Sequence, residues 1–319
     1  MTVKEQVLQQ LELQRGKPVA GQELADALAV SRTAVWKAIR VLQGEGHHIT
    51  SDKRGYTLAQ ESDMLSEAGI RQYLTADLDI RIYRQVDSTN SEAKRLAAAG
   101  LNHPTLLVAE EQTAGRGRLG RTFYSPEHNG CYFTLLLQPG TTLSSTVLTT
   151  IAAAVAVCRA VTACGGPETE IKWVNDIYLN GKKLCGILTE AITDFESQTV
   201  SSLIIGIGIN TGSLPQEVPQ EVRGIAASLY EVSVGRNRLI AETANALLSI
   251  LETGAEQCLP EYRARSFLLG KEIQYQRDGV THTALTEDIA PDGGLIVLEN
   301  GERKVLHSGE VSVRQKKEN

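Results

Sequence analysis

The sequence has little of the material from which metal centres, disulfide frameworks and membrane spans are built. Its five cysteines are scattered without a CxxC pair, and its six histidines show no ligand spacing. This argues against a metal or disulfide framework and predicts reduced thiols in a cytoplasmic protein. The sequence has no run of about 18 uncharged apolar residues, and the nearest, 143–157, predicts a buried helix. The first residues are amphipathic and include acidic side chains, so we expect neither a signal peptide nor a membrane partner.

Common nucleotide and catalytic motifs are also missing. There is no GxxxxGK[ST] loop and no well-placed GxGxxG fingerprint, which disfavours P-loop and Rossmann nucleotide sites. No Ser/His/Asp or Cys/His arrangement supplies a protein nucleophile. Any bound phosphate must therefore be held by arginine and lysine side chains. A chain of 319 residues is long enough for about two or three domains.

The first 60 residues have a different charge balance from the rest of the chain. Residues 1–60 hold eight Lys/Arg and six Asp/Glu, a net charge of +2, whereas the whole chain has −6. The pattern predicts short helices, the last of which runs from Arg32 to about Gln43 with Ser31 as its N-cap. Residues 48–58 then alternate like a hairpin with 52–55 at its tip.

This order of elements indicates a winged helix-turn-helix domain over residues 1–62. The capped helix would enter the major groove of DNA, and the hairpin tip would contact the backbone. The predicted DNA contacts are Ser31, Arg32, Thr33, Trp36, Lys37 and Arg40 on the helix, with Lys53 and Arg54 at the tip. A small helical interaction domain with a solvated charged face is the alternative.

The most distinctive stretch is EEQTAGRGRLGR, residues 110–121, which follows an apolar strand pattern at 105–109. Glycine lets the backbone approach a ligand closely, and arginine offers donors that suit carboxylate and phosphate. The stretch therefore predicts a loop that wraps an anionic small molecule. The alternatives are a solvated basic loop and a nucleic-acid contact.

Other segments of the chain have the helix and strand patterns of an α+β domain. Thr89 and Glu92 have the spacing of a capping box that begins a helix, although the same N-terminus could face a ligand. A hairpin turn is predicted at Asn180-Gly181, after a strand that carries Lys172. The strand 201–210 contains two glycines that allow close packing, and residues 211–228 lack periodicity and predict a mobile loop.

Five blocks together resemble the biotin protein ligases in order and spacing. They are VDSTN (86–90), EQTAGRGRLGR (111–121), KWVNDIYL (172–179), KLCGILTE (183–190) and GIGIN (206–210). With the N-terminal winged helix, the match is to the bifunctional kind, which is both ligase and biotin operon repressor. One departure is Val174, where the family often has proline; a β-branched residue suits the strand.

The resemblance implies roles for individual residues. Lys172 and Arg118 are the implied catalytic residues, and Asn175 and Asp176 are implied magnesium or nucleotide contacts. The loop 211–228 is expected to order over the adenylate. The implied biotin and adenylate contacts are Ser88, Thr89, Asn90, Gln112, Gly115, Arg116, Gly117, Arg118, Arg121, Lys172, Gly186 and Asn210.

The resemblance also implies an activity and partners. Biotin and ATP, with Mg²⁺, would form biotinyl-5′-AMP, and a lysine of the biotin carboxyl carrier protein of acetyl-CoA carboxylase would then take the biotin. The adenylate would favour a homodimer on operator DNA in the cytoplasm. The alternatives are a lipoate ligase, which shares the catalytic fold, and a repressor that only senses biotin.

The implied architecture has three domains. A class II synthetase-like mixed or antiparallel sheet with helices occupies 63–268, after the winged helix of 1–62. Short strand patterns at 271–276, 281–289, 295–299 and 304–307 predict a small barrel over 269–319, which the family implies is SH3-like. Arg314 is either a nucleotide contact or a solvated terminal charge.

Overall fold

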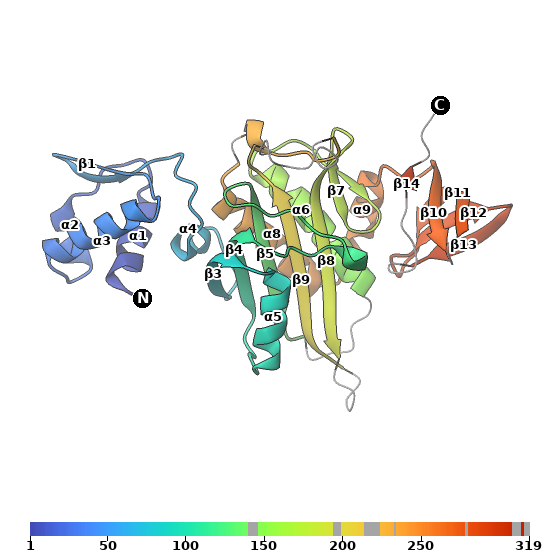
Figure 1. The fold of residues 1–319 in the computed structure, drawn as a ribbon, viewed down its shortest axis with the longest axis horizontal. Helices are drawn as coiled ribbons and strands as arrows, with labels where there is room; N and C mark the ends of the chain where they lie inside the picture. Colours follow the sequence, from blue (N-terminus) through green and yellow to red (C-terminus); the bar gives the residue numbers. More distant parts are fainter. Residues whose placement is uncertain are drawn as a thin grey trace. The chain divides into compact units, whose positions relative to one another are not determined.

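The computed structural model describes residues 1–139, 146–193, 199–213, 224–232, 234–277 and 280–307, with the backbone of 314–315. The described chain forms two compact units (Figure 1). The first contains Met1–Thr75 and Gly235–Ala241, and the second contains Ala76–Val234 and Glu242–Asn319.

The first unit is a winged helix-turn-helix, as predicted. Its elements are α1 (Val3–Leu13), α2 (Gly21–Ala27), α3 (Arg32–Gly44), β1 (Ile49–Asp52), β2 (Gly55–Leu58) and α4 (Glu67–Arg71). Ser31 caps α3 by accepting a hydrogen bond from the Ala34 N–H, so the predicted start of this helix is confirmed. β1 and β2 form an antiparallel hairpin whose last pair is Asp52 and Gly55.

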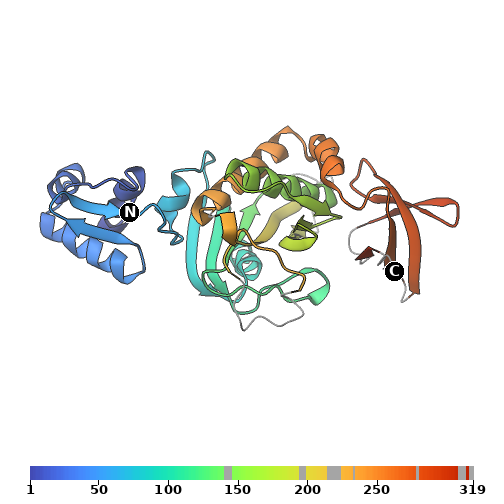
Figure 2. The ribbon, with the colours of Figure 1, turned by 90° about the horizontal axis from the view of Figure 1, so that it is seen from above.

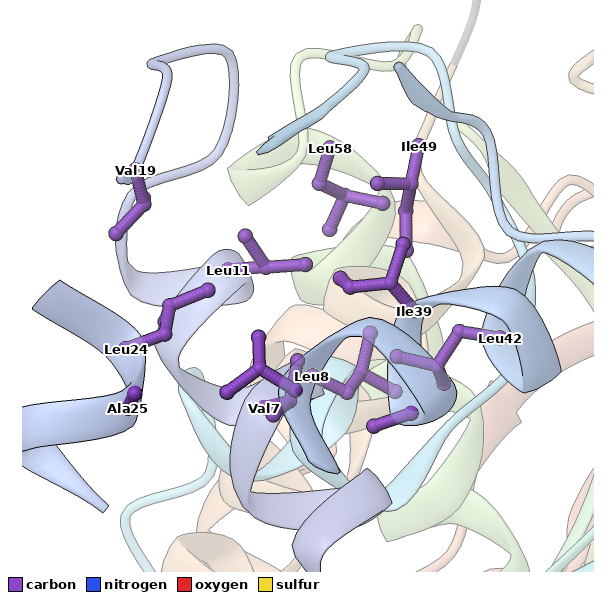
Figure 3. Packing of buried hydrophobic residues seen from close by; sticks show 12 residues of the cluster. Val7, Leu8, Leu11, Val19, Leu24, Ala25, Ile39, Leu42, Ile49 and Leu58 are labelled. Atoms are coloured by element: carbon purple, nitrogen blue, oxygen red, sulfur yellow. The ribbon is translucent and has the colours of Figure 1, made fainter. Parts of the chain in front are cut away.

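A compact apolar core holds this unit together. Figure 3 shows Leu11 of α1, Leu24 of α2 and Ile39 of α3 converging with Ile49 and Leu58 of the hairpin. Four apolar residues of α3 are buried in this core: Val35, Ala38, Ile39 and Leu42. The opposite face of the helix is exposed and carries polar side chains together with Trp36 and Val41.

The second unit is built on a mixed sheet. Its order is β3-β4-β5-β9-β8-β7-β6, with β3 and β4 parallel and the other neighbours antiparallel. The strands are β3 (Asp79–Val86), β4 (Thr105–Gln112), β5 (Gly130–Leu137), β6 (Glu170–Lys172), β7 (Asp176–Leu179), β8 (Lys182–Thr193) and β9 (Val200–Asn210). This confirms the predicted mixed sheet.

The two faces of the sheet are covered differently (Figure 2). α6 (Thr146–Ala163) packs on β7 and β8, while α5 (Thr89–Ala98) packs on β4, β5 and β9 from the other side. α8 (Arg236–Thr253) begins in the first unit, and its part from Glu242 onward lies on the same side of the sheet as α6. α6 is long and apolar enough to cross a membrane, but 78% of it is buried in the fold, so it is a core helix, as predicted. The first residues of that prediction, 143–145, lie outside the described residues.

The remaining elements complete the second unit. Short 3-10 helices are η1 (Arg118–Gly120), η2 (Tyr230–Val232) and η3 (Ala255–Cys258), and α9 (Leu259–Arg265) follows η3. The C-terminal strands form an antiparallel sheet of order β13-β12-β11-β10-β14. They are β10 (Glu272–Arg277), β11 (Val280–Ile289), β12 (Leu295–Glu299), β13 (Glu302–Leu306) and β14 (Arg314–Gln315), which confirms the predicted run of short strands.

Candidate functional site

Three glycines form a floor on the face of the sheet that α5 covers. Gly186 of β8 pairs with Gly208 of β9, and Gly206 lies two residues along the same strand, so all three face the same side. A β-carbon at Gly206 would lie 2.0 Å from Asn90 Oδ1, and one at Gly208 would lie 2.4 Å from the Phe123 ring. Only glycine at these positions lets α5 and the Gly/Arg loop approach the sheet this closely. We call Gly186, Gly206 and Gly208 the glycine floor.

The N-terminal end of α5 lies against the glycine floor. Ser88, Thr89 and Asn90 are all buried, and Asn90 Nδ2 donates to the Leu188 carbonyl at 3.1 Å. The predicted capping box at Thr89 is wrong. Ser88 is the N-cap, without a side-chain cap bond, and Thr89 is the first helical residue. The Thr89 hydroxyl instead lies 2.7 Å from Thr134 Oγ1, because tertiary packing against β5 takes the group that a local cap would use.

Gln112 ties this terminus to the Gly/Arg loop. Its Oε1 accepts from the Thr89 N–H at 2.9 Å, and its Nε2 donates to Ser125 Oγ at 2.8 Å. The loop doubles back on itself, since the Phe123 N–H donates to the Gly115 carbonyl at 2.9 Å. A β-carbon at Gly115 would lie 2.3 Å from the Phe123 carbonyl oxygen, so this turn requires glycine. The loop therefore closes over the glycine floor with Phe123 beneath it.

Arg118 is the arginine of this loop whose guanidinium is buried next to Asn175. Its Nη1 donates to Asn175 Oδ1 at 2.9 Å. Its Nη2 is buried and finds no hydrogen-bond partner within the part of the chain that the structure describes. Burial lowers the pKa of Arg118, but a guanidinium starts high enough to stay charged. A buried guanidinium with an unused donor suits a carboxylate or phosphate oxygen.

The family resemblance implied that Lys172 is the catalytic lysine, but the lysine that lies at the glycine floor is Lys183. Lys172 lies on the edge strand β6, over the Tyr178 ring at 5.7 Å from its centroid. Lys183 Nζ lies 2.7 Å from Asp176 Oδ1 and 3.3 Å from a β-carbon built at Gly186. Lys183 begins the block KLCGILTE, from which only Gly186 was predicted to be a site residue. The position of Lys183 in this block is the sequence feature that could have indicated it.

Lys172 lines a separate cleft of about 310 Å³. Its other lining residues are Glu170, Tyr178, Gly181, Phe267 and Lys271. The Lys271 ammonium lies over the Phe267 ring at 5.6 Å, as Lys172 does over Tyr178. Lys172 therefore faces residues between α9 and β10, not the glycine floor.

Asn175 and Asp176 do not have the surroundings of a vacant metal site. Asn175 Oδ1 accepts from Arg118, and Asp176 Oδ1 is paired with Lys183. No group of three His, Cys, Asp or Glu side chains that could hold a metal occurs in the described ranges. A resident magnesium ion would have to displace two cations, so the residues do not fit one.

Of the remaining candidate residues, Asn210 and Arg116 are placed by side-chain hydrogen bonds. Asn210, at the end of β9, donates from Nδ2 to the Ala227 carbonyl at 3.0 Å, and Lys183 is bonded through its backbone to Ile225 and Ala227. The described ends of the predicted mobile loop are thus attached to β8 and β9; residues 214–223 lie outside the described residues. Arg116 Nη2 lies 3.4 Å from Glu190 Oε1. Arg121 is exposed at the end of η1, and the side chain of Arg314 is not described.

The predicted DNA contacts all lie on the outside of the first unit. Trp36 is 53% exposed, a high value for so large an apolar side chain. Arg54 pairs with Asp52 across the hairpin tip at 3.0 Å. The exposed residues are Ser31, Arg32, Thr33, Trp36, Lys37 and Arg40 on α3, and Lys53 and Arg54 on the hairpin.

Comparison with known proteins decides the family. Family models match in chain order: a helix-turn-helix domain at residues 3–57, the biotin/lipoate A/B protein ligase family at 82–210, and the biotin protein ligase C terminal domain at 268–314. The bifunctional ligase/repressor BirA of Bacillus spizizenii is 44% identical over 219 residues, 67% of each chain. This chain belongs to the biotin protein ligase family.

Other relatives agree with this assignment. The bifunctional ligase/repressor BirA of Escherichia coli is 26% identical over 309 residues, which is 95% of each chain. Among solved structures, the biotin protein ligase of Aquifex aeolicus, in complex with biotin and ATP, matches with a TM-score of 0.62 and 28% identity. The match covers 75% of this chain and 99% of that one. The lipoate ligase alternative is disfavoured, because the C-terminal match is to the biotin protein ligases.

Proposed function

We propose that this biotin protein ligase activates biotin with ATP to biotinyl-5′-AMP and transfers the biotin to a lysine of a biotin carboxyl carrier protein. With its helix-turn-helix domain, it also represses transcription of biotin synthesis genes when the adenylate is bound. The observation that carries the enzymatic half is the group of cations at the glycine floor. Arg118 has a buried, unused donor there, and Lys183 approaches Gly186.

The first step requires two anions to meet. A biotin carboxylate oxygen attacks the α-phosphorus of ATP, the bond to the bridging oxygen breaks, and pyrophosphate leaves. Arg118 and Lys183 are placed to hold the carboxylate and the α-phosphate together, since each offers N–H donors beside the floor. Stabilising charge that develops in the transition state is typically the largest catalytic effect of such groups.

The second step needs no protein nucleophile. The ε-amine of the carrier lysine attacks the acyl carbon of the mixed anhydride, an amide bond forms, and AMP leaves with the bonding electrons. The attacking nitrogen loses one proton as the amide forms, and this proton passes to solvent water as AMP leaves. The protein contributes by positioning the anhydride and excluding water.

Biotin recognition is assigned to the polar groups around the floor. We propose that Ser88, Thr89 and Asn90 at the start of α5 face the bicyclic head, and that Gln112 holds that terminus to the loop. The other proposed biotin and adenylate contacts are Gly115, Arg116, Gly117, Arg118, Arg121, Gly186 and Asn210. Phe123 and Lys183 are added to this set from the geometry.

ATP needs partners for its phosphates. We assign Arg121 to the triphosphate, while Lys172 becomes a phosphate contact from the neighbouring cleft rather than the residue at the carboxylate. Magnesium is proposed to enter bound to the ATP phosphates, as part of that substrate. Asn175 and Asp176 are proposed to orient Arg118 and Lys183, and no step is assigned to a metal held by them.

Regulation extends the proposal beyond the catalytic region. The carrier is proposed to be that of acetyl-CoA carboxylase, since relatives are named biotin–[acetyl-CoA-carboxylase] ligases. We propose that adenylate binding orders the segment 211–228 and favours a homodimer on operator DNA, in the cytoplasm. We further propose domain boundaries after residues 62 and 268.

Biotin-dependent exchange of pyrophosphate into ATP tests the adenylation step. Exchange with biotin and none with lipoate is expected; exchange with lipoate alone would move the activity to the lipoate ligases. A gel-shift assay on biotin-operon DNA, with and without biotin plus ATP, tests the repressor. Silence in the exchange assay together with a biotin-dependent gel shift would leave a repressor that only senses biotin.

A further inference from the structure

Glu190 of β8 receives hydrogen bonds from both segments that surround the glycine floor. Its side chain is only 19% exposed. Its Oε2 accepts from Asn90 Nδ2 at 3.0 Å, and its Oε1 lies 2.7 Å from Lys94 Nζ and 3.4 Å from Arg116 Nη2. One carboxylate thus joins the first turns of α5 to the Gly/Arg loop.

Glu190 and the Leu188 carbonyl together set the direction of a chain of hydrogen bonds. A carboxylate and a backbone carbonyl only accept, so the Asn90 amide turns its NH₂ toward these two groups and its oxygen toward Thr134. Thr134 Oγ1, 2.7 Å from Asn90 Oδ1, must then donate to that oxygen. A hydroxyl has a single hydrogen, so Thr134 cannot also donate to the Thr89 hydroxyl, 2.7 Å away. The Thr89 hydrogen therefore goes to Thr134 Oγ1 or to Gln112 Oε1, which lies 3.2 Å away.

This direction decides what Thr89 can offer a ligand. Because the Thr89 hydrogen is used within the protein, by Thr134 or by Gln112, the Thr89 oxygen keeps a lone pair for an N–H donor. The bicyclic head of biotin carries urea N–H groups, which are donors of that kind. Gly206 makes the arrangement possible, since any β-carbon there would meet Asn90 Oδ1 at 2.0 Å.

We propose that Glu190 is a positioning residue for biotin recognition, which acts through Asn90, Thr134 and Thr89 and holds Arg116 on the same carboxylate. The inference rests on the proposed function and adds a residue to it. It differs from a general structural role because it predicts an effect on biotin and not on ATP.

The decisive variant is Glu190→Gln. The substitution keeps the shape of the side chain, but in either orientation of the new amide its NH₂ faces a donor, Asn90 on one side or Lys94 and Arg116 on the other. We expect KM for biotin in the exchange assay to rise about tenfold or more, equivalent to about 1.4 kcal/mol of binding. KM for ATP should stay within about twofold of wild type, because Arg121 and Lys172, the residues assigned to the triphosphate, are unchanged. The kcat should also stay within about twofold, because Arg118 and Lys183 are unchanged.

Glu111→Gln is the matched control. Glu111 lies on β4 and accepts a single neutral hydrogen bond, from Gln85 Nε2 at 2.8 Å. This variant should leave both KM values unchanged. Thr134→Val, which keeps shape and removes the donor, interrupts the same chain elsewhere and should reproduce the selective loss for biotin; it serves as the test if Glu190→Gln fails to fold.

These experiments distinguish failure of the proposed function from failure of the role assigned to Glu190. Wild-type protein without biotin-dependent exchange would overturn the proposed function itself. Wild-type exchange with an unchanged biotin KM in folded Glu190→Gln, or with equal increases in both KM values, would overturn only the role of Glu190. Thermal unfolding of each variant, measured by circular dichroism, shows which of them are folded.

Discussion

Replacing Gly206 by alanine perturbs the glycine floor with one methyl group. The new β-carbon would lie 2.0 Å from Asn90 Oδ1 and 2.7 Å from its Cγ. Ordinary contacts between such atoms are well above 3 Å, so the Asn90 amide must retreat by roughly 1 to 1.5 Å. The backbone pairing of β9 with β5 and β8 does not involve this side chain, so the sheet itself is retained.

The magnitude follows from what holds Asn90 in place. Its amide bonds the Leu188 carbonyl at 3.1 Å, Glu190 Oε2 at 3.0 Å and Thr134 Oγ1 at 2.7 Å. A retreat of this size breaks these bonds, each worth about 1 kcal/mol net, so the site loses about 2 to 3 kcal/mol. If that loss falls on the ligand-binding conformation, biotin affinity falls by about 30- to 150-fold.

Titration calorimetry with biotin measures this affinity directly, and the exchange assay measures the corresponding KM. Gly44→Ala is the control, because a β-carbon at Gly44 meets no atom within 4 Å and the residue ends α3 in the other unit. A Gly206→Ala protein that binds biotin within about twofold of wild type would refute the reasoning. It would mean that Asn90 does not contribute to biotin binding from this position.

Variants of other side chains each test one proposed role or interaction. Arg118→Met should fold normally, lose roughly 100-fold or more in the rate of adenylate formation, and release adenylate faster; unchanged retention of adenylate, followed by filter binding, would contradict its role. Lys183→Met should lower kcat for exchange by a similar factor of about 100, whereas Lys172→Met should mainly raise KM for ATP; steady-state kinetics of both variants decides which lysine meets the carboxylate. Lys37→Ala should weaken operator binding and reduce its salt dependence by about one unit of log–log slope without changing exchange, measured by fluorescence anisotropy. Hydrogen bonds from Arg95 lower the pKa of Asp87 to about 2, so this pair stabilises the folded state above pH about 4 and loses its effect as the pH falls toward 2; the stability difference between wild type and Asp87→Asn in urea unfolding should shrink over that range.

The local features of this protein were set by its sequence alone. Ser31 before an apolar helix pattern fixed the start of α3, and Asn180-Gly181 fixed the hairpin between β7 and β8. Such features depend on side chains that act within a few residues of themselves, so a linear pattern contains them. The residues of the Gly/Arg loop also predicted an anion-binding loop, because glycine allows close backbone approach and arginine offers donors to an anion.

Only the tertiary structure decided which distant residues meet at the site. Thr89 has the spacing of a cap, yet β5 places Thr134 where it takes the hydroxyl. Lys172 and Lys183 are both lysines near the same hairpin, and the pairing of Gly186 with Gly208 sends Lys183 to the floor. Strand register and side-chain direction arise from contacts across the sheet, so adjacency along the chain does not encode them. That is why the sequence predicted the family and a set of candidate site residues, while the lysine at the floor and the hydrogen-bond chain to Glu190 came from the fold.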